Sequence, residues 1–144
     1  MLAATDLLAE TKVAPELSNE AHYYRAKAYL DAGKVEGAMD DLKILAKDTR
    51  NIYGAEAKYK VAQIYFDAGQ TEQAEKEVLD YIEVSTPHTY WLARSFVLLS
   101  DVYMKLGRNL DAKQYLLSLK QNYQADDDIA GMIESRLNKL NAEN

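Results

Sequence analysis

The stretch that decides the fold is residues 62–78, which read AQIYFDAGQTEQAEKEV. In this stretch Tyr65 precedes Gly69 by four residues, and Ala74 and Val78 follow the glycine by five and nine residues. Residues three or four positions apart lie on the same face of a helix. We therefore interpret the stretch as the end of one helix, a turn at the glycine, and the start of a second helix.

The same pattern occurs three times along the chain. A tyrosine stands four residues before Gly33, Gly69 and Gly107, and an alanine stands five residues after each of them. A small residue seven positions before the glycine and a branched apolar residue nine positions after it complete each copy, with periods of 36 and 38 residues. Such a repeat predicts helical hairpins that cannot bury their apolar faces alone, so successive hairpins must stack.

The composition agrees with stacked helices and excludes several classes of protein. The chain has 144 residues, no cysteine, two prolines and six glycines. Without cysteine there is no disulfide framework and no thiolate nucleophile. A net charge of −6 disfavours a nucleic-acid-binding protein. No apolar run approaches the roughly 18 residues that a membrane span requires.

The repeated pattern resembles the tetratricopeptide repeat (TPR), whose period is about 34 residues. The resemblance implies an all-α fold, a right-handed α-solenoid of antiparallel helix hairpins, built as a TPR superhelix. One difference from the family concerns the large aromatic residue expected seven positions before the tyrosine, which is present only as Phe96 and is replaced by His22 and Lys58 in the other two copies. The expected divisions are the second helix of a truncated repeat, three complete repeats and a C-terminal capping helix, at 1–18, 19–52, 53–88, 89–125 and 126–144.

Within these divisions the sequence predicts helices over 1–13, 19–32, 35–48, 54–68, 71–84, 88–106, 109–122 and 127–141. Thr86 before Pro87 indicates a helix start with the proline at the first helical position. The aspartates at 126–128 precede the last helix, and we expect one of them to cap its free N–H groups. Because no partner helix precedes residues 1–13, we expect a C-terminal fragment of a longer TPR protein, and the alternative is a natural short protein whose first helix is a cap. The composition and motifs resemble those of bacterial TPR proteins. The compartment stays open between the cytoplasm and the periplasm.

The candidate reactive groups form no known catalytic or metal-binding motif. His22 and His88 are the only two histidines, and neither has a partner at zinc-binding spacing. Asp40 and Asp41 are adjacent on a predicted helix, so their carboxylates point in different directions. Neither a phosphate-binding glycine loop nor a hydrolase nucleophile motif occurs. We therefore expect a protein that is not an enzyme and that uses no metal and no cofactor.

The resemblance also implies where a partner protein or peptide would bind, because first helices of TPR hairpins line a concave surface. The residues that we expect on that surface lie at or beside positions six and two residues before the signature tyrosines: Tyr23, Lys27, Tyr59, Lys60, Gln63, Phe66, Arg94 and Asp101. The carboxylate clamp of some TPR domains is rejected, because Arg94 alone supplies a cation at a matching position. Tyr90 and Trp91 are expected to pack on the preceding repeat, with an aromatic recognition patch as the alternative.

A second hypothesis treats the chain as a structural spacer and cap. In that case it belongs to a larger assembly or cell-envelope protein that self-associates, and upstream repeats make the partner contacts. The predicted helix over 1–13 would expose Leu2, Leu7 and Leu8, which leaves open a homodimer through this helix. The sequence alone does not name the partner, the compartment or the oligomeric state.

Overall fold

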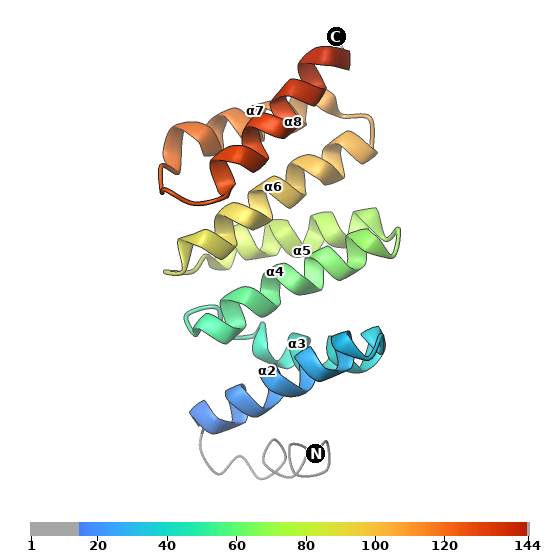
Figure 1. Ribbon diagram of the computed structural model, residues 1–144, viewed down its shortest axis with the longest axis vertical. Coiled ribbons are helices and arrows are strands. Elements are labelled where there is room, and N and C mark those ends of the chain that lie inside the picture. The colour runs from blue at the N-terminus through green and yellow to red at the C-terminus, as the bar shows by residue number, and fades with distance from the viewer. Residues whose placement is uncertain (1–14, 144) are drawn as a thin grey trace.

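The computed structural model describes residues 15–143, and this part of the chain contains seven helices and no strand. The helices are α2 (Pro15–Asp31), α3 (Val35–Leu45), α4 (Ile52–Asp67), α5 (Thr71–Val84), α6 (Thr89–Lys105), α7 (Asn109–Asn122) and α8 (Ile129–Glu143). Consecutive helices pack as hairpins that stack along one axis (Figure 1). The predicted all-α solenoid of helix hairpins is confirmed, whereas the predicted helix over 1–13 and its leucines lie outside the described residues.

Each hairpin closes through the same turn. Gly33, Gly69 and Gly107 have φ angles of 75°, 80° and 78°, in the left-handed region that favours glycine. In every turn the N–H after the glycine donates to the carbonyl of the signature tyrosine, and the N···O distances are 2.8 Å in the first turn, 2.9 Å in the second and 2.7 Å in the third. This is the Schellman motif, which satisfies carbonyls that the helix end would leave unpaired.

The two helices of a hairpin play different parts in the stack. The first helices, α2, α4 and α6, contact one another in a row that α8 continues. Among the described residues, the second helices α3, α5 and α7 contact members of that row but not one another. The row α2–α4–α6–α8 lies on one side of the stack, with α3, α5 and α7 behind it (Figure 1), and we call it the inner row.

The signature positions are the packing positions between helices. The small residues before the glycines and the alanines after them are all at most 1% exposed: Ala26, Ala62, Ser100, Ala38, Ala74 and Ala112. Small side chains allow the paired helices to approach closely, and the branched apolar residue of each copy fills the remaining space. One hydrophobic cluster spans α4 to α8, and a smaller one joins α2, α3 and α4.

The position where the sequence departs from the TPR pattern lies between the two helices of each hairpin. It is filled by a facing pair in every repeat: His22 with Asp41 (2.9 Å), Lys58 with Glu77 (3.0 Å) and Phe96 with Tyr115 (ring centroids 6.1 Å apart). The three pairs are related by the repeat periods of 36 and 38 residues. The same space therefore holds a polar pair in two repeats and an aromatic pair in the third, which explains how the fold accommodates the departures.

Several helix boundaries differ from those predicted. α2 begins at Pro15 rather than at residue 19, and α3 ends at Leu45 rather than at 48. α6 begins at Thr89, so Pro87 precedes the helix and the predicted start at the proline is wrong. The Thr86 hydroxyl accepts from the His88 N–H at 3.1 Å and donates to the Thr49 carbonyl, and these bonds hold the segment in a loop.

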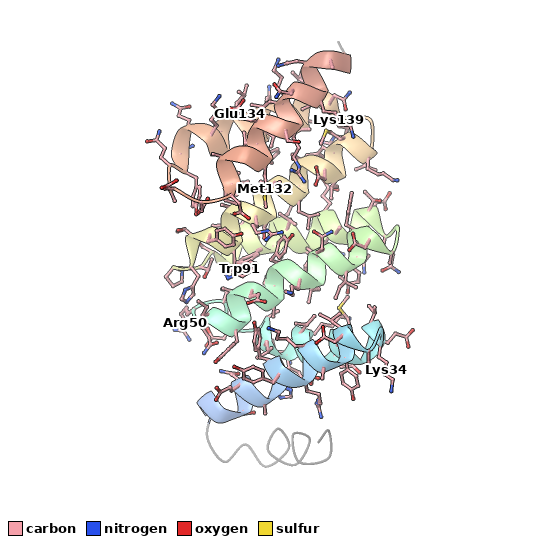
Figure 2. All side chains as sticks on the ribbon, viewed as in Figure 1. Lys34, Arg50, Trp91, Met132, Glu134 and Lys139 are labelled. Carbon is pink, nitrogen blue, oxygen red and sulfur yellow. The ribbon has the colours of Figure 1, made fainter. Side chains whose placement is uncertain are left out.

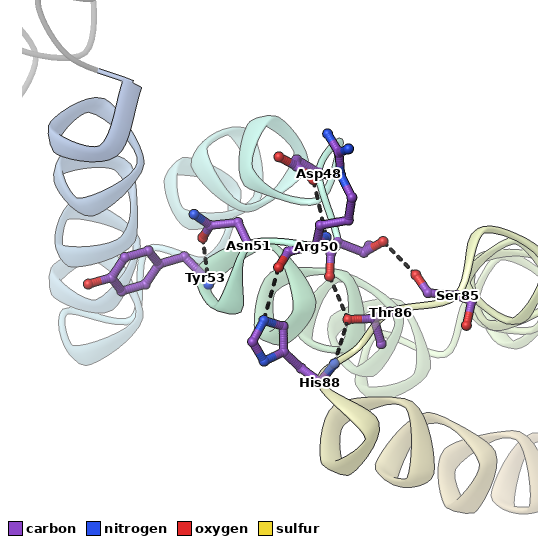
Figure 3. A network of polar contacts seen from close by, with 8 residues as sticks. Asp48, Arg50, Asn51, Tyr53, Ser85, Thr86 and His88 are labelled. Carbon is purple, nitrogen blue, oxygen red and sulfur yellow. Dashed lines mark hydrogen bonds and ion pairs between the residues drawn. The ribbon is translucent and has the colours of Figure 1, made fainter.

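That loop is bonded to the loop between α3 and α4 (Figure 3). The Thr49 hydroxyl donates to the Ser85 carbonyl at 2.6 Å, and His88 Nε2 lies 3.0 Å from the Arg50 carbonyl. α4 starts directly against the same backbone, because a Cβ added at Gly54 would lie 1.9 Å from the carbonyl oxygen of Asp48. The two inter-repeat loops are thereby fixed to each other.

Candidate functional site

Three adjoining cavities lie along the inner row of helices, with volumes of about 380, 90 and 490 Å³. The first two share Tyr59, Gln63 and Arg94, and the last two share Asp101. We call this continuous surface the inner groove and define it by the residues that line the cavities: Leu30, Tyr59, Lys60, Gln63, Ile64, Phe66, Asp67, Trp91, Arg94, Val97, Leu98, Asp101, Met104, Lys105, Met132, Arg136 and Lys139.

An arginine surrounded by three aromatic rings forms the start of the groove. The Arg94 guanidinium carbon lies 5.0 Å from the ring centroid of Tyr59, 5.9 Å from that of Trp91 and 6.0 Å from that of Tyr90. Tyr90, Trp91 and Arg94 share one face of α6 because they are three or four residues apart. Cation–π attraction and ring packing fix the half-buried guanidinium in place.

Hydrogen bonds extend from this arginine along α4. The Tyr59 hydroxyl accepts from Arg94 Nη2 at 3.3 Å and donates to Gln63 Oε1 at 2.8 Å. Gln63 in turn donates to Asp67 at 2.8 Å, and the Tyr90 hydroxyl donates to Asp128 at 2.9 Å. Burial raises the pKa of Tyr59, so its hydroxyl is a protonated donor at neutral pH. The side chains of this part of the groove are therefore held in fixed directions.

The middle of the groove is closed by an ion pair between α6 and α8. Arg136 donates to both carboxylate oxygens of Asp101, at 2.7 and 2.9 Å. Met132, one turn before Arg136 on α8, lines the same cavity (Figure 2). The helix that was predicted only to cap the stack is thus also a wall of the groove.

The far end of the groove combines an apolar floor with two lysines. Phe66 of α4 and Met104 of α6 form the floor, and Lys105 and Lys139 stand beside them. Both lysines are exposed, and neither forms an ion pair with another described residue. Lys139 comes from α8 (Figure 2), and Lys105 is the last residue of α6. Cationic groups therefore meet over an apolar surface.

The structure places the eight predicted site residues in two groups. Six of them line the inner groove: Tyr59, Lys60, Gln63, Phe66, Arg94 and Asp101.

Tyr23 and Lys27 form a separate cluster on α2. The Lys27 ammonium lies 5.3 Å from the Tyr23 ring centroid, and the Tyr23 ring packs 4.7 Å from that of Tyr53. The Tyr23 hydroxyl donates to Glu56 at 3.2 Å. Burial, with a contribution from Glu56, raises the pKa of Tyr23 to about 12. The hydroxyl therefore stays protonated, as a donor to Glu56, throughout the neutral range.

Trp91 packs on the preceding repeat and also lines the inner groove. Its ring packs on Tyr59 of the preceding repeat, with centroids 5.7 Å apart, and this confirms the expected packing role. It also lines the inner groove near the start of α6 (Figure 2). Counting back from the signature tyrosines missed Trp91, because it lies six residues, more than one and a half turns, nearer the helix start than Val97, the earlier of the two positions counted on α6. Its one-turn spacing from Arg94 is the signal that could have found it.

The two histidines and Asp127 have structural partners. His22 contacts Asp41, and His88 contacts the neighbouring loop. Asp127 accepts from the Ile129 N–H at 2.9 Å, which confirms the expected capping of α8. Across residues 15–143 no group of three or more His, Cys, Asp or Glu side chains gathers where it could hold a metal ion. In the same part of the chain, every helix is too short or too polar to cross a membrane.

Comparison with known families gives two matches. Residues 20–48 and residues 93–122 each match a family model described as a tetratricopeptide repeat. The first match covers most of α2 and α3, and the second covers most of α6 and α7. Comparisons with curated proteins and with solved structures found no match.

Proposed function

Because the chain is a tetratricopeptide-repeat protein, and repeats of this family typically form non-catalytic scaffolds for protein interaction, we propose that it binds a protein or peptide in the inner groove. The observation that carries the proposal is the continuity of the groove. Three cavities join across α4, α6 and α8, on the side of the stack where successive first helices meet. A continuous surface of this kind suits an extended segment better than a small molecule.

The dimensions of the groove suit a short peptide. The groove residues of α6 run from Trp91 to Lys105, which are fourteen residues apart, and this corresponds to about 21 Å along the helix at 1.5 Å per residue. An extended chain advances about 3.3 Å per residue, and about six residues would therefore cover that distance.

The groove also contains the residue types that dominate binding energy at protein interfaces. Tyrosine, tryptophan and arginine are the most enriched of these types, and here Tyr59, Trp91 and Arg94 adjoin one another. Because ring packing and hydrogen bonds already hold these side chains, little conformational entropy would be lost when a partner binds.

The proposal is tested by selecting ligands for the full chain from a displayed random-peptide library and mapping the bound peptide by amide chemical-shift changes. We expect the shifts to follow the inner groove. Arg94→Ala should weaken binding about tenfold or more, which is typical of a central interface residue. Arg50→Ala is the matched control, because Arg50 is largely exposed in the loop before α4 and lies outside the groove. Its effect should be less than about twofold.

A footprint outside the inner groove, or a library that yields no binder, would contradict the proposal. Equal losses for Arg94→Ala and Arg50→Ala would contradict it as well. A chain that binds no peptide in this groove would instead fit the spacer-and-cap hypothesis, in which upstream repeats make the contacts.

A further inference from the structure

The charge of the inner groove is opposite to the charge of the chain. Among the groove residues, five are cationic and two carry carboxylates: Lys60, Arg94, Lys105, Arg136 and Lys139 against Asp67 and Asp101. The whole chain has a net charge of −6. An excess of cations on one surface of an acidic protein attracts an anionic partner to that surface and not to the rest of the molecule.

Three of the five cations are not neutralised within the described residues. Lys60 lies 3.6 Å from Glu56, and Arg136 is paired with Asp101. Arg94, Lys105 and Lys139 form no ion pair there. The hydrogen bonds of Arg94 go to two tyrosine hydroxyls at 3.3 Å, which is long for an N–H···O bond. A carboxylate would give this guanidinium shorter and stronger charge-assisted bonds.

The unneutralised cations lie at two separate positions in the groove. Arg94 and Lys105 are eleven residues apart on α6, which is about 16 Å at 1.5 Å per residue. Lys139 lines the same cavity as Lys105. The Asp101–Arg136 pair makes the stretch between the two positions electrically neutral.

Each cationic position adjoins apolar surface. Ile64 and Trp91 line the cavity that contains Arg94, and Phe66 and Met104 line the cavity that contains Lys105. A ligand group seated at either position would therefore contact a cation and an apolar side chain together.

We propose that the inner groove binds an acidic, extended peptide segment with two carboxylate side chains about five residues apart, each beside a large apolar residue. The spacing follows from the 16 Å between the cationic positions and about 3.3 Å per extended residue. The inference rests on the proposed function, to which it adds the chemical class of the partner.

The test uses a fluorescently labelled synthetic peptide of about eight residues, with two glutamates five positions apart and a leucine beside each. A second peptide has glutamine in place of both glutamates. In anisotropy titrations with the full chain at low salt, the glutamate peptide should bind about tenfold more tightly than the glutamine peptide, and the difference should shrink as salt is added.

The protein variants separate a local site from the general field of the molecule. Lys105→Gln with Lys139→Gln should weaken the glutamate peptide several-fold and leave the glutamine peptide unchanged. Lys34→Gln with Lys76→Gln is the matched control, because it removes the same charge from exposed positions outside the inner groove. All four substituted lysines are exposed, so folding, checked by circular dichroism, should be unaffected.

Two results bear on the charge inference alone. Equal affinities for the two peptides, or equal losses in the two double variants, would overturn it. In either case the proposed function would still stand, provided that Arg94→Ala weakened the binding of both peptides. The charge inference would also be overturned if the glutamate peptide failed to bind while library peptides of other composition still gave footprints in the inner groove. The proposed function would stand in that case as well. A single-stranded oligonucleotide of similar charge that binds as tightly as the peptide would overturn the assignment to a peptide.

Discussion

Replacing Asp41 by alanine should remove one of the strongest polar contacts between α2 and α3. Asp41 is 1% exposed and accepts hydrogen bonds from His22 at 2.9 Å and from Arg25 at 2.6 and 2.8 Å. The variant keeps the largely buried guanidinium of Arg25 but removes this carboxylate. Breaking a buried ion pair by deleting one partner costs about 3–5 kcal/mol. In a chain of this size we expect the melting temperature to fall by roughly 10–20 °C.

The assay is urea unfolding followed by far-ultraviolet circular dichroism, with Asp40→Ala as the control. Asp40 is the adjacent residue on α3 and is exposed, so its replacement should change the free energy of unfolding by less than about 0.5 kcal/mol. The reasoning would be refuted by a loss below about 1 kcal/mol for Asp41→Ala, or by equal losses for the two variants.

Three further predictions concern packing and pH. Gly54→Ala should lower the free energy of unfolding in urea by at least about 2 kcal/mol, because the added Cβ meets the backbone of the preceding loop. Gly131 in α8 has open space around it, so Gly131→Ala should raise the free energy of unfolding by about 0.5–1 kcal/mol. Lys58→Phe combined with Glu77→Tyr copies the Phe96–Tyr115 pair of the third repeat, and urea unfolding should give a free energy within about 1 kcal/mol of the parent. Lys58→Phe alone should be less stable than this double variant. Burial raises the pKa of Tyr81 from 10.0 to about 12, so the stability contributed by its protonated form is complete below pH 10 and is lost as pH rises towards 12. The urea midpoint should therefore fall less steeply with pH in Tyr81→Phe than in the parent. Identical slopes for the two proteins would contradict the assignment.

The hairpins could be predicted from the sequence because their determinants are local. A glycine that adopts positive φ, a tyrosine four residues before it and small residues at fixed distances specify the turn and the close helix contact. The start of α6 could not be predicted in the same way. Thr86 is bonded to Thr49, 37 residues earlier in the chain, and this contact holds Pro87 in a loop. A local start signal at the proline therefore gave the wrong boundary.

The candidate groove was predictable to the extent that helix faces can be counted. Positions counted from the signature tyrosines placed Tyr59, Gln63 and Asp101 on one surface, because three or four residues make one helical turn. The contribution of α8 could not be counted, since its placement depends on tertiary contacts, among them the burial of Ile129 and Ile133 and the pair between Asp101 and Arg136. Tyr23 does not line the inner groove and instead contacts Tyr53 and Glu56 of the next repeat.

The absence of contact between α3, α5 and α7 within the described residues has a mechanical consequence. Each second helix packs instead on the first helix of the next repeat, α3 on α4 and α5 on α6, so a tilt between repeats changes only those junctions and the inner row, which acts as the hinge line. Small tilts add up along an array, so the two ends of the stack can shift by far more than any single junction does. The stack of repeats would then behave as a stiff spring whose curvature changes with the size of a bound molecule.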